Sequence, residues 1–266
     1  MSLRLGRLDV DEVSKSFDDS SRTTFVVDRC SFSLEPEKLT VMVGPSGCGK
    51  STLINLIAGY ERPTSGAILL DGRPVSGPAE DRLVVFQETA LFPWMSVLNN
   101  VAFGPLSRGT GDRTEVLERA GSLLEKVGLR GFADRYPSQL SGGMQRRVEL
   151  ARAIINEPRV MLMDEPFRGL DAMTRELMQE HYLRLFENRP RTNLFVTSEL
   201  KEAVFLGDRL LMMTQKPTRV VRVINIDLPR PREFHMLTSP RFRAIYEDAL
   251  GMLYENDETS LSSSKL

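Results

Sequence analysis

A glycine-rich segment carries the residues whose types and spacing best suit chemistry. It consists of Gly44, Pro45, Ser46, Gly47, Cys48, Gly49, Lys50, Ser51 and Thr52. The glycines allow the backbone to curl with its N–H groups pointing inward, and the N-terminus of a following helix adds to this anion cradle. Lys50 can reach the β- and γ-phosphates of a nucleotide, and the Ser51 hydroxyl can bind Mg²⁺. The segment therefore predicts a P-loop that binds ATP together with Mg²⁺.

A pair of carboxylates further along the chain can complete such a site. Asp164 and Glu165 directly follow the apolar run Val160–Met163, which is typical of a strand buried on both faces. Open α/β sheets bind their ligands at this end of their strands. Asp164 then fits a second ligand of the metal, and Glu165 fits the general base that polarises the attacking water. The alternative is a solvated turn, which the P-loop upstream disfavours.

Short apolar runs alternate with helical patterns, and this alternation indicates an α/β domain that positions these residues. Leu39–Val43 predicts a buried strand leading into the P-loop, and Ser51–Ala58 predicts the helix after it. Further strands are expected at Ala67–Leu70, Leu83–Phe86, Val160–Met163, Asn193–Thr197, Leu210–Thr214 and Val220–Ile226. A terminal helix is expected at Arg241–Leu253, followed by a disordered tail over the polar, serine-rich residues 257–266.

Between about Thr89 and Pro158 the sequence has no pattern typical of strands and instead shows helical periodicity. Thr114–Val127 has this periodicity. One face of a second helix is lined by Met144, Val148, Ala151 and Ile155. We therefore expect a helical insert within the sheet domain.

The composition is that of an ordinary globular protein, and it narrows the classes of function. The chain has 266 residues, of which 41% are hydrophobic and 27% are charged, enough for one large domain or two small ones. Its formal net charge of -1 gives no support for a nucleic-acid binder. Two cysteines, Cys30 and Cys48, are too few for a disulfide framework. No apolar run approaches the roughly 20 residues of a bilayer span, so we expect a chain that does not itself cross a membrane.

A second anion site is predicted at the start of the later helix. Residues 140–145 read Leu-Ser-Gly-Gly-Met-Gln, so that Ser141, Gly142 and Gly143 offer a hydroxyl and backbone N–H groups at a helix N-terminus. One chain rarely needs two such sites for one triphosphate. Two chains arranged head to tail do need them.

The order of three motifs resembles that in the ATP-binding subunit of an ABC transporter. The P-loop comes first, the Leu-Ser-Gly-Gly-Met-Gln segment second, and a hydrophobic strand ending in Asp-Glu-Pro third. The resemblance covers about residues 5–230. It implies a P-loop NTPase core of the RecA-like α/β type, an antiparallel β subdomain and an inserted helical signature subdomain. We therefore expect an ABC ATP-binding domain over 1–230, with its core at 1–87 and 158–230 and its helical insert at 88–157. A C-terminal helix and disordered tail would occupy 231–266.

The resemblance also implies a dimer, in which ATP lies between the P-loop of one subunit and residues 140–145 of the other. We call residues 140–145 the signature. Ser141, Gly142 and Gly143 would contact the γ-phosphate held by the partner. Asp171 matches the aspartate of the family that faces the partner. The second ATP-binding subunit is either another copy of this chain or a different chain.

Two further site residues are implied by the resemblance. Gln87 matches a glutamine that links Mg²⁺ and water to the membrane subunit, and a plain polar residue at a strand end is the alternative. Phe17 lies where the family often has an aromatic residue that stacks on adenine. Phe25 competes for this role, and either ring could instead belong to the core.

The segment Leu91–Gly104 contains the only tryptophan, Trp94, among apolar residues. Trp94 either belongs to the core or lines a docking groove for a helix of a membrane partner. This segment resembles the importer branch for nitrate, sulfonates and taurine. The same resemblance is carried by two other runs: Asp-Glu-Pro-Phe with its continuation to Arg175, and Pro-Arg-Pro-Arg ending at Arg232. The implied partners are a multispanning membrane permease and a separate solute-binding protein, with no nucleic acid. The implied location is peripheral, at the cytoplasmic face of the membrane.

Two positions depart from the family pattern. The family has a switch histidine that bonds the γ-phosphate and positions the attacking water, where this chain has Ser198 before Glu199. Serine is too short to span that gap directly, although a water can bridge it. The alternative is that Ser198 caps a helix starting near Glu199. Arg168 replaces a small residue near the dimer interface, where it can touch a phosphate, an acidic partner residue or solvent.

The missing histidine predicts slow hydrolysis by a homodimer, because losing one transition-state hydrogen bond costs on the order of 10²–10³-fold in rate. Binding and dimer closure should survive, since Lys50, Glu165 and the signature are intact. Two alternatives to an importer subunit remain: a hydrolysis-impaired partner in a heterodimer, and a soluble ABC ATPase that acts on DNA or ribosomes. The single cassette and the docking segment disfavour the soluble enzyme.

Overall fold

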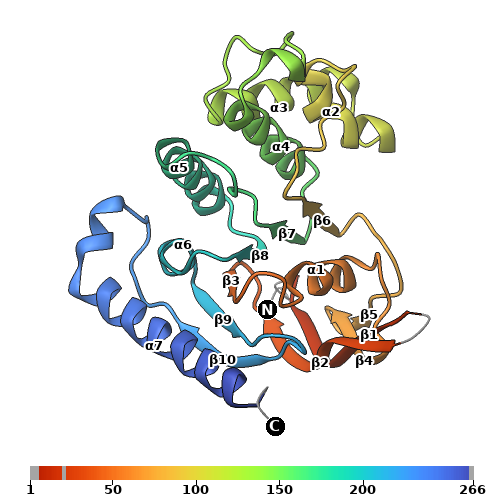
Figure 1. Ribbon diagram of the computed structural model, residues 1–266. Helices are drawn as coiled ribbons and strands as arrows, with labels where there is room; N and C mark the ends of the chain where they lie inside the picture. The colour runs from red at the N-terminus through yellow and green to blue at the C-terminus, as the bar shows by residue number, and fades with distance from the viewer. Residues whose placement is uncertain (1–5, 20–21, 264–266) are drawn as a thin grey trace, which may run out of the picture.

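The computed structural model describes residues 6–19 and 22–263, whose strands form two sheets (Figure 1). The larger sheet has the strand order β10-β9-β3-β8-β7-β6. Its strands are β3 (Leu39–Val43), β6 (Arg82–Val85), β7 (Val160–Asp164), β8 (Thr192–Thr197), β9 (Arg209–Met213) and β10 (Val220–Asn225). All of them are parallel except β10, which pairs antiparallel with β9. The strands predicted in this part of the sequence are confirmed.

The parallel arrangement brings the carboxyl ends of these strands to one edge of the sheet. There β3 enters the P-loop, and helix α1 (Lys50–Ala58) follows it as predicted. Strand β7 ends at Asp164, and β8 ends at Thr197, directly before Ser198. Strand β6 ends shortly before Gln87. Segments far apart in the sequence thus converge at this edge.

The parallel strands bury both of their faces. In β3, Leu39, Val41 and Val43 face a core completed by α5 (Ala172–Asn188) and α6 (Leu200–Leu206). Met42 faces a second core, which α1 and the smaller sheet complete. Double burial explains why these strands are apolar throughout, and it holds the strand ends in fixed positions.

The smaller sheet is antiparallel and has the order β2-β1-β4-β5. Its strands are β1 (Leu8–Asp19), β2 (Arg22–Leu34), β4 (Ser65–Leu70) and β5 (Arg73–Pro74). The sequence patterns predict β4 but not β1 and β2. Irregularities shift the β1–β2 register, and Glu12 and Arg29 adopt positive φ values of 46° and 41° beside them. Such bulges break the two-residue alternation that identifies a strand.

Helices α2 (Val97–Arg108), α3 (Arg113–Lys126) and α4 (Gly142–Ile155) form a separate group at the top of Figure 1. Helix α3 agrees with the predicted one, and α4 buries Val148, Ala151 and Ile155 on the predicted face. Leu150 and Ala153 on another face of α4 pack in the core of the larger sheet. Helix α4 therefore belongs to both cores and joins the helical group to the sheet.

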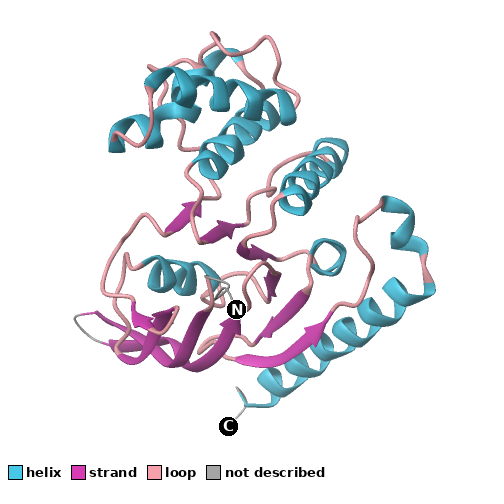
Figure 2. Ribbon diagram, turned by 180° about the vertical axis from the view of Figure 1, so that it is seen from behind, coloured by secondary structure: helices cyan, strands magenta, loops and turns pink. Residues whose placement is uncertain are grey.

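Helix α7 (Pro240–Ser263) runs along the sheet beside β10 (Figure 2). Phe242, Ile245 and Ala249 pack it against the core, and the predicted terminal helix is confirmed. The structure differs from the expected disordered tail, because α7 continues to Ser263. No proline interrupts residues 241–263, and extending a formed helix costs less than starting one. The rest of the expected tail, residues 264–266, lies outside the described residues.

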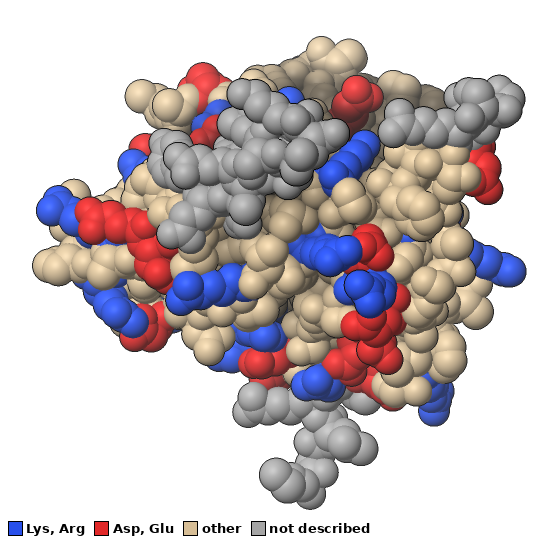
Figure 3. Space-filling view, turned by 60° about the horizontal axis from the view of Figure 1, so that its bottom comes forward, with Lys and Arg blue, Asp and Glu red and all other residues tan. Residues whose placement is uncertain are grey.

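Within the described part of the chain, no helix combines the length and the apolar composition that a bilayer span requires. Figure 3 shows Lys and Arg side chains interspersed with Asp and Glu side chains over one face of the molecule. The mixture agrees with the formal net charge of -1. This face therefore offers no large area of a single charge sign.

Candidate nucleotide site

Lys50 is the first residue of α1, directly after the glycines of the P-loop. Its ammonium group donates hydrogen bonds to the carbonyl oxygens of Gly44 at 2.8 Å and Pro45 at 2.9 Å, and only 4% of the residue is exposed. Gly49 has a φ of +121°, and a Cβ there would lie 2.9 Å from Cγ1 of Val26. Only glycine fits this position without strain. The loop thus curls around a buried cation at the end of β3.

Asp164, at the end of β7, forms a side-chain hydrogen bond with Ser51 of α1. Burial raises the pKa of the Asp164 carboxyl, the hydrogen bond with Ser51 lowers it, and the charge of Glu165 raises it again. Hydroxyl and carboxylate oxygens are ligands that Mg²⁺ prefers. The fold therefore places two oxygen atoms that could bind Mg²⁺ side by side.

Glu165 lies between two cations. Its backbone has a positive φ of 43°, and its N–H donates to the carbonyl oxygen of Val196 at 3.0 Å. The residue is 9% exposed. Atom Oε1 lies 4.0 Å from Nζ of Lys50, and Oε2 accepts a hydrogen bond from Nη1 of Arg168 at 2.8 Å. The carboxylate is thus fixed at the sheet edge, near the buried lysine of the P-loop.

Arg168 contacts an acidic residue of its own chain, whereas the expected contacts were a phosphate, an acidic residue of the partner or solvent. The Arg168 N–H also donates to the carbonyl oxygen of Glu165 at 3.1 Å, so a tight turn brings the two residues together. The arginine side chain is 54% exposed, so solvent contact, one of the expected alternatives, is present as well. The signal in the sequence was the three-residue spacing of the two opposite charges.

Ser198 is exposed directly after β8, and its predicted capping role is wrong. The N-cap of α6 is Glu199, which makes no side-chain capping bond. Instead, the buried Thr197 hydroxyl accepts a hydrogen bond from the Glu199 N–H at 3.0 Å. It also donates one to the Glu202 carboxylate at 2.7 Å. Thr197 satisfies the backbone at the end of the strand, so the helix start does not need Ser198.

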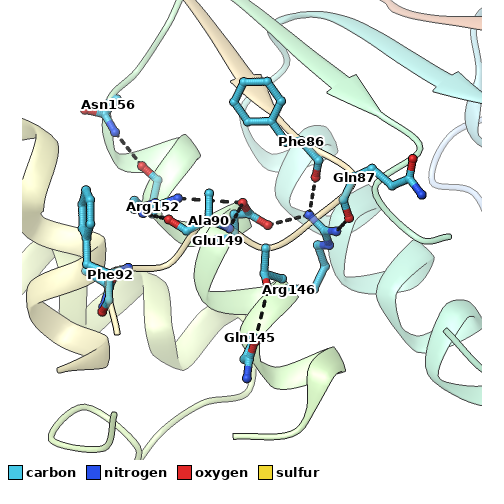
Figure 4. A network of polar contacts seen from close by, with 11 residues as sticks. Phe86, Gln87, Ala90, Phe92, Gln145, Arg146, Glu149, Arg152 and Asn156 are labelled. Atoms are coloured by element: carbon cyan, nitrogen blue, oxygen red, sulfur yellow. Dashed lines mark hydrogen bonds and ion pairs between the residues drawn. The ribbon is translucent and has the colours of Figure 1, made fainter. Parts of the chain in front are cut away.

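Gln87 is exposed just beyond β6, and α4 fixes its backbone (Figure 4). Arg146 of α4 donates to the carbonyl oxygen of Phe86 at 2.7 Å and also to that of Gln87. The same guanidinium pairs with Glu149 one turn further along the helix, and both side chains are buried. The segment that carries Gln87 is therefore bonded to the helix that begins with the signature.

Glu149 and Arg152 extend this link to Ala90 (Figure 4). The Glu149 carboxylate accepts from the Ala90 N–H at 3.1 Å, and Arg152 donates to the Ala90 carbonyl oxygen at 2.8 Å. Burial raises the pKa of Glu149, and the Arg146 charge opposes that rise. Sequence reasoning missed these residues. The available signal was an arginine and a glutamate three residues apart among the apolar positions of α4.

The signature and Asp171 lie side by side. The Ser141 hydroxyl caps α4 by accepting a backbone N–H at 3.3 Å, and Asp171 caps α5 in the same way at 3.0 Å. A Cβ at Gly143 would lie 2.7 Å from Cγ2 of Thr174 in α5. The P-loop lies at α1, in the lower part of Figure 1. Ser141, Gly142 and Gly143 lie at the start of α4, in the upper helical group of Figure 1, so the two anion sites of one chain lie apart.

Phe17 and Phe25 are 43% and 55% exposed on the antiparallel sheet, so the core alternative is wrong for both. Phe17 pairs with Thr24, whereas Phe25 pairs with Ser16. Paired residues share a face and successive residues alternate, so the two rings point to opposite faces of the sheet. At most one of them can stack on a given base. Lys15 lies over the Phe17 ring, 4.8 Å from its centroid.

Trp94 is 69% exposed, and the alternative that it belongs to the core is therefore wrong. Its ring centroid lies 5.6 Å from that of Phe92, which in turn lies 4.6 Å from that of Phe103. Phe92 and Phe103 line a groove of about 360 Å³ bounded by residues of β6, α2 and α4. We call these three aromatic residues and their groove the aromatic groove. Exposed aromatic side chains beside a groove are typical of protein contact surfaces.

Comparison with known proteins places these features in one family. A family model described as ABC transporter matches residues 27–168. An uncharacterized ABC transporter ATP-binding protein of Methanocaldococcus jannaschii is 46% identical over 228 residues, which cover 85% of this chain and 85% of that protein. The nitrate import ATP-binding protein NrtD of Synechococcus elongatus is 38% identical over 259 residues, covering 95% and 93%. The taurine import ATP-binding protein TauB of Roseobacter denitrificans is 41% identical over 232 residues, covering 86% and 86%.

A solved structure is also similar to this chain. It is a dimeric ATP-binding cassette in a post-hydrolysis state, bound to ADP and Pi. The likeness has a TM-score of 0.72 at 27% sequence identity, and it covers 84% of this chain and 100% of that chain. Together with the mixed α/β sheets, it confirms the expected P-loop NTPase fold class.

Proposed function

Because this chain belongs to the ABC transporter family, we propose that it is the ATP-hydrolysing subunit of an importer for a small organic or inorganic anion of the nitrate, sulfonate or taurine type. Relatives named for nitrate and taurine import match this chain over most of its length, which supports the importer branch. The observation that carries the proposal is the meeting of Lys50, Asp164 and Glu165 at the carboxyl edge of the parallel sheet.

We assign binding of the nucleotide phosphates to the P-loop, residues 44–52. Lys50 is buried and already donates to two carbonyl oxygens, so its charge is held where the β- and γ-phosphates would lie. Ser51, Asp164 and Gln87 would hold Mg²⁺, which offsets the negative charge of the phosphates when it is bound. The hydrogen bond between Ser51 and Asp164 supports this assignment, because it shows that both oxygen donors reach one place. Phe17 is our choice for the ring that stacks on adenine.

Glu165 is proposed as the general base of hydrolysis. As the oxygen of a water molecule bonds to the γ-phosphorus, the carboxylate accepts the proton of that water. The bond from the γ-phosphorus to the bridging oxygen breaks, and ADP leaves with its electron pair. The proton then passes from Glu165 to solvent. The carboxylate's burial and its place near Lys50 support this role.

A second ATP-binding subunit would complete the site. Ser141, Gly142, Gly143 and Asp171 lie together on one chain but away from its own P-loop, so their anion site faces another molecule in the proposal. A head-to-tail pair lets each signature reach the γ-phosphate held by the other subunit. The solved relative is described as dimeric, which supports such an arrangement.

The aromatic groove is the proposed contact with a multispanning permease at the cytoplasmic face of the membrane. The groove is also lined by Glu149 and Arg152, whose side chains form hydrogen bonds with the backbone of Ala90. The proposed helical insert, residues 88–157, thus presents the partner surface and carries the signature. A separate solute-binding protein would select the transported anion, and nucleic acid has no part in the proposed function.

The decisive experiment compares the purified chain with Glu165→Gln and Lys50→Ala variants. We expect ATP hydrolysis by the parent chain, ATP binding without hydrolysis by E165Q, and weakened binding by K50A. ATP should also convert E165Q into a stable dimer, visible by light scattering. Hydrolysis that persists in E165Q, or binding of ATP that does not need Lys50, would refute the assignment. Co-purification with a multispanning membrane protein tests the transport role.

Ser198 supports a second candidate, a hydrolysis-impaired subunit that pairs with a different ATPase. Its hydroxyl is exposed at the position of the family's switch histidine and takes no part in the Thr197 network. Single-turnover hydrolysis by the parent and by Ser198→His separates the candidates. An impaired site predicts a rate increase of roughly 10²-fold in S198H, since one transition-state hydrogen bond returns. A parent that is already fast and matches S198H excludes the impaired site.

A further inference from the structure

The contact of Arg168 with Glu165 has no part in the mechanism above. The Arg168 guanidinium donates to Oε2 of Glu165 at 2.8 Å. On the other side of the carboxylate, Nζ of Lys50 lies 4.0 Å from Oε1. A carboxylate oxygen that accepts a hydrogen bond from arginine is less available to accept a proton from water, because both compete for the same lone pairs.

Local geometry keeps Arg168 beside the carboxylate. The turn bond from the Arg168 N–H to the Glu165 carbonyl oxygen is 3.1 Å long, and the Glu165 N–H is bonded to Val196 of β8 at 3.0 Å. The backbone of both residues is therefore fixed to the sheet. The guanidinium can reach Glu165 without any rearrangement of the chain.

The exposures of the two side chains differ, and this difference allows the pair to open. Glu165 is 9% exposed, whereas the Arg168 side chain is 54% exposed. Arginine can leave for solvent at small cost, because half-exposed ion pairs contribute little net stability. The carboxylate remains in place when it does so. The contact can thus form and break within each catalytic cycle.

We propose that Arg168 is a positioning residue that competes with the attacking water for the Glu165 carboxylate and thereby slows ATP hydrolysis. This inference rests on the proposed role of Glu165 as the general base. The fraction of molecules in which Arg168 holds the carboxylate sets the size of the effect. Replacing Arg168 by a residue that cannot bond Glu165 should increase kcat and leave ATP binding at Lys50 unchanged.

The experiment measures kcat and KM for ATP in Arg168→Ala and Arg168→Gln. We expect kcat to rise roughly threefold in R168A with KM unchanged, because a half-exposed ion pair that is closed about twice as often as it is open leaves about a third of the carboxylates free. R168Q can still donate a neutral hydrogen bond, so its kcat should lie between those of R168A and the parent. Added salt should accelerate the parent relative to R168A, because it screens an exposed ion pair. A melting curve for each variant confirms that it is folded.

Arg184→Ala is the matched control. Arg184 also pairs with a glutamate of its own chain, Glu180, and its side chain is 67% exposed, but it lies on α5 outside the site. The control should leave kcat and its salt dependence unchanged. A similar rise in R184A would show that loss of any surface arginine produces the effect, and this would overturn the inference.

Two other outcomes would also overturn it. A fall of kcat in R168A that S198H restores would mean that Arg168 supplies the γ-phosphate contact that the histidine makes in the family. An unchanged kcat would mean that the ion pair does not affect the reaction. The E165Q variant separates this inference from the proposed function. If E165Q is inactive while R168A equals the parent, only the role of Arg168 fails; if E165Q is active, the general base itself is wrong.

Discussion

Glu202 is a buried carboxylate of α6 that contacts the end of β8, and its environment favours the protonated form. Its carboxylate accepts hydrogen bonds from Thr197 at 2.7 Å and from Gln179 at 2.8 Å. Burial raises the pKa of Glu202 above the ordinary value of 4.5, and the two hydrogen bonds offset part of that rise. Between the unfolded and folded pKa values, the folded chain therefore binds more protons. The contribution of Glu202 to the free energy of unfolding therefore falls as pH rises through this window.

Glu202→Gln should remove this dependence, because glutamine keeps the shape and carries no charge. We expect E202Q to melt above the parent at pH 8, by about 2–4 °C for each kcal/mol of charge burial removed. The difference should shrink as pH falls through the raised pKa of Glu202, because the parent carboxyl then becomes protonated. Thermal melting from pH 4.5 to pH 8 measures it. Glu118→Gln, at an exposed residue of α3 that is not among the charges acting on Glu202, is the control and should not change the profile. A parent that loses stability relative to E202Q on acidification contradicts the argument.

At the scale of elements, α4 is bonded to the segment after β6 by a buried ion pair. Arg146→Met leaves the buried Glu149 with only the more distant Arg152, 3.8 Å away, which should cost up to about 3–5 kcal/mol in the free energy of unfolding. The double variant R146M/E149L removes both charges and should recover most of that loss. In the double variant the Phe86 and Gln87 carbonyl oxygens would still lack the Arg146 donor. Hydrogen exchange of the backbone amides at residues 86–90 should therefore be faster than in the parent.

Urea unfolding and hydrogen exchange check this expectation. Arg184→Met, which breaks an exposed pair on α5, is the control and should cost at most about 1 kcal/mol. The argument is refuted if R146M is as stable as the control. It is also refuted if exchange at residues 86–90 is as slow in the double variant as in the parent.

The sequence predicts the parallel strands well because their burial on both faces leaves short apolar runs, of which Leu39–Val43 is the clearest. Strands β1 and β2 escape prediction because bulges near Val13 shift the alternation on which prediction relies. At the site, the P-loop could be predicted because its chemistry depends on consecutive residues. The Arg146 network could not, since its acceptors are backbone oxygens of a distant segment that only the fold brings near.

At the scale of the whole molecule, the aromatic groove should matter for association rather than for stability. Trp94 is 69% exposed, so Trp94→Ala should change the free energy of unfolding by less than about 0.5 kcal/mol. Basal ATP hydrolysis should also be unchanged. Association with the membrane partner should weaken at least tenfold, since buried tryptophan anchors often contribute about 2 kcal/mol or more at interfaces.

Pull-down of the permease from detergent-solubilised membranes measures the effect. Val221→Ala, at an exposed apolar residue of β10, is the control and should leave association unchanged. If W94A binds the membrane partner as tightly as the parent, the aromatic groove is not the contact. Equal weakening in both variants would instead indicate a non-specific loss of apolar surface.

Helix α4 can connect the proposed partner surface to the signature as one rigid element. It has 14 residues and is therefore about 21 Å long. Arg152 lies near one end and lines the aromatic groove, and Ser141 caps the other end. Since α4 packs in two cores along its length, a displacement imposed at the groove would reach Ser141 as a movement of the whole helix. Such a movement would need no series of side-chain rearrangements between the groove and the signature.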